Sequence, residues 1–223
     1  PSGAMLNLER RLQVLKLAVK YQTVVVEDDP YGDLYFGDAP PPSLLALSDQ
    51  VPGSRDWLVY CGSLSKVLSP GLRVGWMIAP EALLARATMC KQFSDAHTST
   101  FAQATAAQYL KAGRMPDTLN TVRRVYAERA RTMGEALSKE LGSALRFTQP
   151  LGGLFFWANL TGANGQETDG SALAKRAIEK GVAFVPGAPF YANNPETSAI
   201  RLSFATADMD KIKEGISRLG QSL

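Results

Sequence analysis

A single lysine lies in the segment GSLSKVLSPGLRVGW, residues 62–76, among small hydroxyl residues and shortly before a Pro-Gly turn and an arginine. The amine of Lys66 can form a Schiff base with an aldehyde, while hydroxyl groups and a guanidinium nearby can bind a phosphate. Pyridoxal 5'-phosphate presents both groups, so the segment is a candidate site for this cofactor. The same residues are also compatible with a strand, a turn and a second strand that leave the lysine in solvent.

A second candidate is the run VVVEDDPY, residues 24–31, in which β-branched residues give way abruptly to acids. The run predicts a buried parallel strand with acids at its carboxyl end, where ligands bind in open α/β sheets. A carboxylate there is costly unless it meets a cation or a strong donor. The protonated pyridine nitrogen of the cofactor would be such a partner for Asp28, and Tyr31 could offer its hydroxyl to the ring 3-oxygen. The alternative is that the acid only caps the next segment.

Five segments together resemble one family. They are, in chain order, EDDPY (27–31), GSLSK (62–66), PGLRVGW (70–76), VPG (185–187) and IRLSF (200–204). The chain resembles fold-type-I, pyridoxal-phosphate-dependent aminotransferases of class I/II, in particular the branch with 2-aminoadipate and aromatic aminotransferases that is shared with MocR-type transcription regulators. Each motif is modest alone, and five in order are specific. The resemblance implies an α/β fold, the C-terminal part of the pyridoxal-phosphate-dependent transferase fold, with a large, mostly parallel sheet and a small α/β domain.

The resemblance also implies roles around the cofactor. Lys66 would be the Schiff-base lysine and the general base, Asp28 would pair with the pyridine nitrogen, and Tyr31 would hydrogen-bond the ring oxygen. Asp29 could take the place of Asp28, although the Asp-x-x-Tyr spacing favours Asp28. The residues that would bind the phosphate are Ser63, Ser65 and Arg73.

For the substrate, the resemblance implies that Arg201 grips the α-carboxylate through a bidentate fork, for which guanidinium geometry is suited. Gly153 lies in a segment that closes over bound substrate in the family, although the adjacent glycines Gly152 and Gly153 are also typical of a tight turn or bulge. Phe190 and Tyr191 could line a substrate side-chain pocket or pack in the core. We expect Trp76 and Trp157 in the core.

Two domains are predicted. Residues 1–113 would be the C-terminal part of the large cofactor-binding domain, and residues 114–223 a linking helix with the small C-terminal domain. The chain opens Pro1-Ser2-Gly3, where the family carries an Asn-Pro-(Thr/Ser)-Gly motif, so we expect a fragment cut inside that motif. The part before it would supply a phosphate-binding loop and an aromatic that stacks on the ring.

Periodicity and turn residues predict the elements that position these side chains. Helices are expected over 6–21, 80–93, 101–112, 117–141, 170–180 and 208–219. Strands are expected over 23–27, 58–62, 74–79, 145–148, 153–160, 182–185 and 199–204. The helix at 208–219 should begin at Asp208 as its cap.

Composition limits the other classes of function. The 223 residues are 45% hydrophobic, and the longest apolar stretches are only strand-sized, so no membrane span is expected. His97 is the single histidine, which argues against a metal site and against Ser-His-Asp chemistry in this chain. Cys61 and Cys90 have neither metal spacing nor a disulfide framework, and a reducing, cytoplasmic setting fits them.

The sequence therefore predicts amino-group transfer between an amino acid and a 2-oxo acid, with a homodimer expected because active sites in the family form between two subunits. The alternative is the effector-binding, aminotransferase-like domain of a MocR-type regulator. A nucleic-acid partner is expected only if a DNA-binding domain lies upstream. The net charge of +3 is mild, and the basic residues near 123–131 alternate with acids as on a solvated helix face.

Overall fold

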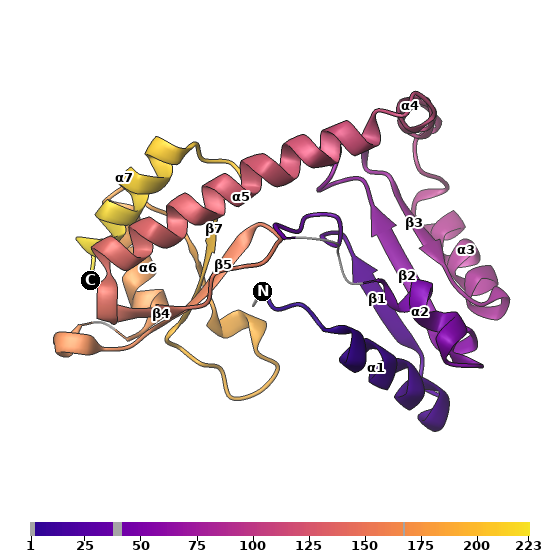
Figure 1. The fold of residues 1–223 in the computed structure, drawn as a ribbon, viewed down its shortest axis with the longest axis horizontal. Helices are drawn as coiled ribbons and strands as arrows, with labels where there is room; N and C mark the ends of the chain where they lie inside the picture. The colour runs from indigo at the N-terminus through magenta and orange to yellow at the C-terminus, as the bar shows by residue number, and fades with distance from the viewer. Residues whose placement is uncertain (1–2, 38–41, 167) are drawn as a thin grey trace. The chain divides into compact units, whose positions relative to one another are not determined.

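The computed structural model describes residues 3–37, 42–166 and 168–223, which form an α/β protein of two compact units (Figure 1). One unit comprises Met5–Val122, and the other comprises Arg123–Leu223 together with Gly3 and Ala4. The division falls within helix α5 (Met115–Glu140), so residues 114–122 group with the first unit. Pro1 and Ser2, on which the expectation of a truncated motif partly depends, lie outside the described residues.

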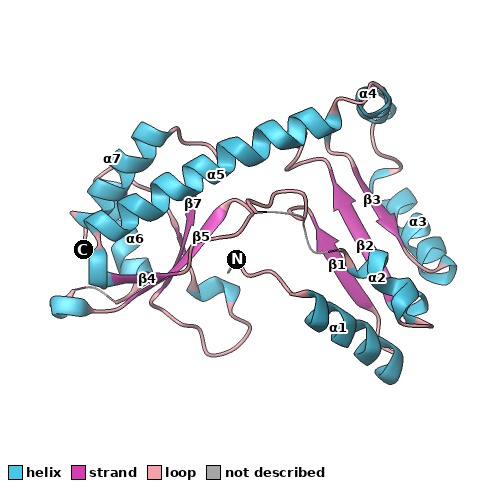
Figure 2. Ribbon diagram, in the orientation of Figure 1, coloured by secondary structure: helices cyan, strands magenta, loops and turns pink. Residues whose placement is uncertain are grey.

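The first unit contains a mixed sheet of β1 (Val25–Asp29), β2 (Leu58–Ser63) and β3 (Gly75–Ile78), in the order β1-β2-β3 (Figure 2). Strand β1 runs parallel to β2, and β3 runs antiparallel to it. The last two predicted strands of this group are confirmed. The first was predicted to end at residue 27, but its pairing with β2 continues to Asp29, which pairs with Gly62. Pairing with a neighbouring strand therefore keeps the acids inside the strand.

The helices of the first unit are α1 (Leu8–Tyr21), α2 (Leu44–Leu47), α3 (Glu81–Asp95) and α4 (Thr100–Lys111). Helix α1 begins where the Asn7 side chain accepts a hydrogen bond from the Arg10 backbone N–H at 2.9 Å. It ends at Gln22, which has a left-handed conformation. The core that joins α1 and α2 to the sheet consists of Leu15, Leu44, Leu47, Val51 and Leu58.

Strand β1 is covered on one face only. Val25, Glu27 and Asp29 are half-buried, whereas Val26 and Asp28 between them are exposed, with Val26 at 59%. The prediction of a strand buried on both faces is therefore wrong for the described chain. The reason is that side chains alternate along a strand, and α1 and α2 pack on the side of Val25.

Glu27 ties three elements together on the covered face. Its Oε1 accepts hydrogen bonds from Arg11 Nη1 of α1 at 3.1 Å and from the backbone N–H of Leu44 at 2.9 Å. Its Oε2 accepts from the N–H of Leu45 at 3.3 Å. The carboxylate thus occupies the first turn of α2, where backbone N–H groups have no partner inside the helix. Both side chains of the Arg11–Glu27 ion pair are largely buried, at 17% and 11% exposure.

We expect Glu27→Gln to lower the free energy of unfolding by about 2 kcal/mol, because charge-assisted hydrogen bonds of a buried carboxylate are lost. Urea unfolding followed by circular dichroism measures the change. Glu135→Gln is the matched control, since Glu135 pairs with Arg131 at 3.5 Å where both side chains are about two-thirds exposed. Its cost should stay below about 0.5 kcal/mol. An equal loss of unfolding free energy in the two variants would contradict a stabilising role of the Glu27 carboxylate.

The second unit contains an antiparallel sheet of β4 (Leu145–Phe147), β5 (Phe155–Leu160), β6 (Val185–Pro186) and β7 (Ala199–Ser203), in the order β4-β5-β7-β6. Its helices are the C-terminal part of α5, α6 (Gly170–Glu179) and α7 (Met209–Gly220). Asp208 caps α7 as predicted, accepting from the Lys211 N–H at 2.9 Å. Strand β6 is shorter than predicted because the N–H of Val182 bonds to the Ala177 carbonyl and so closes the end of α6.

The core of the second unit follows the alternation of β5. Phe156, Ala158 and Leu160 are buried, and Phe155 and Trp157 between them point to the other face. The Phe156 ring makes edge contacts with two further rings: Phe147 at 5.4 Å and Phe204 at 5.9 Å between centroids. The core thus takes one face of this sheet, and Arg201, which pairs with Trp157, lies on the opposite face.

Candidate active site

The acids of β1 and the lysine turn lie at the same edge of the first sheet. Strands β1 and β2 point the same way (Figure 1), with Asp28 beside Cys61. Strand β2 ends at Ser63, and the turn that carries Lys66 follows directly. This edge, at the carboxyl ends of two parallel strands, is the one that binds ligands in open α/β sheets.

Register separates the neighbouring acids Asp28 and Asp29. Residues paired across parallel strands share a face, so Asp28 lies on the face of Cys61 and, two residues on, of Ser63. Burial and then the Asp28 carboxylate raise the pKa of the Cys61 thiol, which agrees with this placement. Within the described part of the chain, the Asp28 carboxylate has no hydrogen bond or ion pair. Its charge is therefore available to a ligand.

Asp29 faces the other way and is already engaged. Its Oδ2 accepts a hydrogen bond from the Tyr60 hydroxyl at 3.3 Å. A Cβ at Gly32 would clash with both carboxylate oxygens of Asp29, so the turn after β1 closes on this side chain. Asp29 therefore serves the local structure, and this supports Asp28 as the acid for a ring nitrogen.

Tyr60 gives this arrangement a pH signature. Burial, followed by the charge of Asp29 and its hydrogen bond, raises the pKa of Tyr60 from 10.0 to about 12. A raised pKa in the folded state adds stability that is complete below pH 10.0 and is lost as the pH rises to about 12.

We expect the free energy of unfolding to fall over this range and Tyr60→Phe to reduce the fall. Urea unfolding between about pH 9 and pH 12 measures it. Tyr21→Phe, at the exposed end of α1, is the control and should leave the parent profile unchanged. Parallel profiles for the Tyr60→Phe variant and the parent protein would show that Tyr60 does not carry the effect.

The turn after β2 gathers two hydroxyls and one cation. The backbone N–H of Ser65 donates to Ser63 Oγ at 3.1 Å, and Arg73 Nη1 donates to Ser65 Oγ at 3.4 Å. Arg73 Nη1 also donates to the Pro70 carbonyl at 3.3 Å, and Arg73 itself has a left-handed backbone with φ 54°. No acid pairs with this guanidinium in the ranges that the structure describes. Such a cation beside two hydroxyls fits an anion such as a phosphate.

Lys66 is exposed and lies in the same turn, between Leu64 and Val67, which are both buried. The buried neighbours fix the turn and leave the amine outside it. Among the described residues, this amine has neither a hydrogen-bond acceptor nor an acidic partner. Tyr31 follows β1 in a turn that is closed by a hydrogen bond from the Leu34 N–H to the Tyr31 carbonyl at 2.8 Å. The catalytic role of Lys66 and the ring contact of Tyr31 stay predictions.

Two predicted substrate residues belong to the second unit. The guanidinium carbon of Arg201 lies 4.3 Å from the ring centroid of Phe155 and 4.6 Å from that of Phe190. Gly153 has φ 73° and open space around its missing Cβ, so backbone conformation rather than crowding favours glycine there. Binding of substrate by Arg201 and Gly153 stays a prediction.

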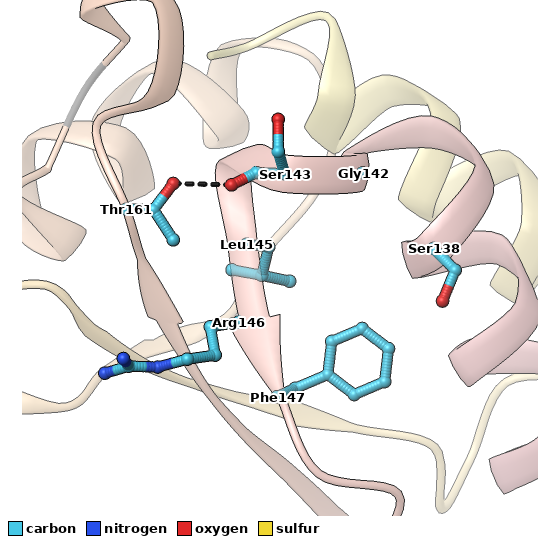
Figure 3. A pocket seen from close by; sticks show the side chains of 7 residues that line it. All are labelled: Ser138, Gly142, Ser143, Leu145, Arg146, Phe147 and Thr161. Atoms are coloured by element: carbon cyan, nitrogen blue, oxygen red, sulfur yellow. Dashed lines mark hydrogen bonds between the residues drawn. The ribbon is translucent and has the colours of Figure 1, made fainter.

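A hollow of ≈ 570 Å³ lies elsewhere in the second unit, on η4 (Gly142–Ala144) and β4. Its lining is Ser138, Gly142, Ser143, Leu145, Arg146, Phe147 and Thr161. Figure 3 shows the Arg146 side chain pointing away from Ser138 and Phe147, while the Thr161 hydroxyl donates to the Ser143 carbonyl at 2.6 Å. None of the predicted site residues lines this hollow.

Three features were not anticipated from the sequence: the ring of Phe155 on Arg201, the Tyr60–Asp29 hydrogen bond and the Glu27–Arg11 ion pair. Each joins residues far apart in the chain. The signal for the first two would have been the register between strands, whereas the ion pair depends on how α1 packs against β1. Trp76 was expected in the core but is 45% exposed, with its ring over Gly62.

Among the described residues, no helix has the length and apolar character needed to span a membrane.

The order of these motifs and the fold that carries them match one family. The sequence profile of the family Aminotransferase class I and II matches residues 1–219, and the chain belongs to this family. It is 43% identical over 225 residues to 2-aminoadipate transaminase of Thermus thermophilus, an alignment that covers all of this chain and 54% of that protein. It is 29% identical to the HTH-type transcriptional regulator YisV of Bacillus subtilis, covering all of this chain and 44% of the regulator.

Among solved structures, the chain resembles LysN, the α-aminoadipate aminotransferase of Thermus thermophilus, complexed with N-(5'-phosphopyridoxyl)-L-leucine. The TM-score is 0.92 at 41% identity, and the match covers 100% of this chain and 56% of that one. The chain therefore spans about half the length of the relatives it matches. The family and the fold, part of that of the pyridoxal-phosphate-dependent aminotransferases, are confirmed.

Proposed function

We propose that the protein transfers an amino group between an amino acid and a 2-oxo acid, with pyridoxal 5'-phosphate as its cofactor. The observation that carries the proposal is the lysine turn. An amine without a partner among the described residues lies next to the hydroxyls of Ser63 and Ser65 and the guanidinium of Arg73, at the sheet edge where Asp28 also lies. Family membership and the likeness to aminotransferase structures support it.

The residues present fit the cofactor. Ser63, Ser65 and Arg73 would bind its phosphate through two hydroxyls and a cation. Asp28 would hold a proton on the pyridine nitrogen, since its carboxylate is available at the strand end and has no acceptor role elsewhere in the described chain. Tyr31 would donate to the ring oxygen. When bound, the cofactor supplies an aldehyde for the amine and a ring that accepts electrons.

Lys66 would carry the covalent attachment and the proton transfer. Its ε-amine is nucleophilic when neutral, and the same amine, once released, can take the proton from the substrate α-carbon. The buried side chains of Leu64 and Val67 on either side keep the turn in place during both tasks. Retaining one base for removal and return of the proton suits a reaction that runs in both directions.

Arg201 would bind the substrate α-carboxylate by two parallel N–H···O bonds. Holding that carboxylate also argues for amino transfer over loss of the carboxylate, since the group that would leave is retained. Gly153 would allow the chain to close near bound substrate, with its left-handed backbone as the enabling feature.

The experiment is a coupled assay of the whole protein, loaded with pyridoxal 5'-phosphate, on panels of amino acids and 2-oxo acids. We expect amino transfer with ping-pong kinetics, because one product leaves before the second substrate binds. No transfer with any pair, while the cofactor remains bound, would refute the proposal.

We further propose a homodimer in the cytoplasm. The large apolar side chains of Phe93 and Phe101 are 84% and 80% exposed on α3 and α4, and apolar surface of this kind is commonly covered by association. The thiols of Cys61 and Cys90 form no disulfide, which fits a reducing compartment. Analytical ultracentrifugation of the whole protein tests the dimer.

A second candidate is the effector-binding domain of a transcription regulator. The match to YisV covers the whole of this chain, and a cofactor or an amino acid bound by the same residues would serve sensing as well as catalysis. The discriminating observation is a basic helix-turn-helix domain upstream together with binding of the whole protein to its own promoter DNA.

A further inference from the structure

Arg201 lies between two neighbouring segments on the face of the second sheet opposite its core, where it is half-buried. In the order β4-β5-β7-β6, strand β7 has β5 on one side and β6 on the other. Arg201 pairs with Trp157 of β5 and with Val185 of β6. Phe155 lies two residues before Trp157, so the alternation of β5 puts it on the face of Arg201. Phe190 comes from η6 (Ala188–Phe190), which follows β6.

The two phenylalanine rings approach one guanidinium from these two sides. The guanidinium carbon lies over the Phe155 ring at 4.3 Å and over the Phe190 ring at 4.6 Å, both within the range of a cation–π contact. Ring faces carry negative charge density and attract the cation without using its N–H donors. In the part of the chain that the structure describes, Arg201 has no hydrogen-bond acceptor and no acidic partner.

Phe190 is 42% exposed, yet aromatic contacts on one side hold its ring in place. Its ring makes an edge contact with Trp157 at 5.6 Å, and Trp157 also contacts the ring of Tyr191 at 6.1 Å. The Tyr191 hydroxyl in turn donates to Glu196 Oε2 at 2.9 Å. This hydrogen bond, together with burial and the Glu196 charge, raises the pKa of Tyr191. The contacts hold the segment after β6 against β5 and so keep the Phe190 ring near Arg201.

We infer that Phe155 and Phe190 are positioning residues, which hold the guanidinium of Arg201 by its face and leave its N–H donors to a carboxylate. The inference rests on the proposed role of Arg201 and adds to it the reason why this long side chain can keep one orientation. Preorganisation of this kind lowers the entropy lost when a carboxylate binds. The two rings should therefore affect binding of the carboxylate more than the chemical step.

The test uses the whole protein with its cofactor and 2-oxoglutarate as the probe, with the dissociation constant measured by isothermal titration calorimetry. Phe155→Leu and Phe190→Leu should each weaken binding by about three- to tenfold, the range of one cation–π contact. Phe190→Tyr keeps the ring and should bind as the parent does. In steady-state kinetics the leucine variants should raise KM for the amino acid and change kcat by less than about twofold.

Phe147→Leu is the control for the loss of a ring alone, because Phe147 contacts Phe156 in the same unit and has no contact with Arg201 among those described. Unchanged binding in both leucine variants at positions 155 and 190, or an equal loss in Phe147→Leu, would overturn the inference. Arg201→Lys separates the positioning role of the two rings from the proposed carboxylate-binding role of Arg201. If it weakens binding while the phenylalanine variants do not, only the positioning role fails; if it leaves binding unchanged, the proposed role of Arg201 fails.

Discussion

Replacing Lys66 with alanine in the whole protein is expected to lower the rate of amino transfer by about ten-thousandfold, the upper range for one positioned acid–base residue. The same variant should lose the visible absorbance that depends on covalent attachment of the cofactor to a lysine. The physical reason is that the exposed amine of the turn is both the nucleophile and the base in the proposed reaction. Absorbance spectra and single-turnover kinetics measure the two effects.

Lys91→Ala is the control for Lys66→Ala. Lys91 is another exposed lysine, held in an ion pair with Asp95 at 2.9 Å on α3. Removing an exposed pair of this kind should cost less than about 1 kcal/mol of stability and leave the spectrum unchanged. Retention of the lysine-dependent absorbance in Lys66→Ala would assign the attachment to another residue and remove the basis of the proposed function.

Replacing Asp28 with asparagine should lower kcat by about a hundred- to a thousandfold, comparable to the loss of one preorganised electrostatic contact in other active sites. The cofactor ring would lose the carboxylate that keeps its nitrogen protonated. Because Asp28 is exposed and has no hydrogen bond within the described residues, stability should change by no more than about 0.5 kcal/mol. Activity and urea unfolding of one preparation measure both.

Asp29→Asn is the matched control, since it changes the adjacent carboxylate on the opposite face of the same strand. It should keep kcat near that of the parent and lower the pKa of Tyr60 from about 12, because the Asp29 charge and hydrogen bond contribute to that value. An ultraviolet titration of the tyrosines detects the shift. Loss of kcat in Asp29→Asn with normal kcat in Asp28→Asn would assign the ring nitrogen to Asp29.

Much of the fold could be predicted because local signals agree with the final packing. The apolar period of α1 and the predicted cap at Asp208 place these helices within a few residues of their observed bounds, although α1 begins after Asn7 rather than at residue 6. The short helix α2 was not predicted. Its four residues are too few to show a period, and its first turn is satisfied by Glu27, distant in sequence. Exposure of Trp76 was also missed, since residue type alone favours burial.

In the candidate site, too, local features could be predicted from the sequence and contacts between distant segments could not. The types and spacing of Lys66, Ser63, Ser65 and Arg73 could be predicted from the sequence, because these residues lie in one short segment that runs from the end of β2 through the turn to residue 73. The hydrogen bonds of that turn are local, so neighbours in the chain are neighbours in space. The contacts of two phenylalanine rings with Arg201 could not be predicted from the sequence, because Phe155, Phe190 and Arg201 meet only through the pairing of β5, β7 and β6.

The sequence by itself determined the family, the order of the elements and the set of candidate residues for the proposed cofactor site, because these depend on residue types and short spacings. The tertiary structure decided which of three consecutive acids is available. Glu27 is used by α1 and α2, Asp29 by Tyr60, and Asp28 faces the other side of the sheet. The Asp-x-x-Tyr spacing favoured Asp28 but left Asp29 open, because side chains alternate along a strand and only packing determines which face is covered.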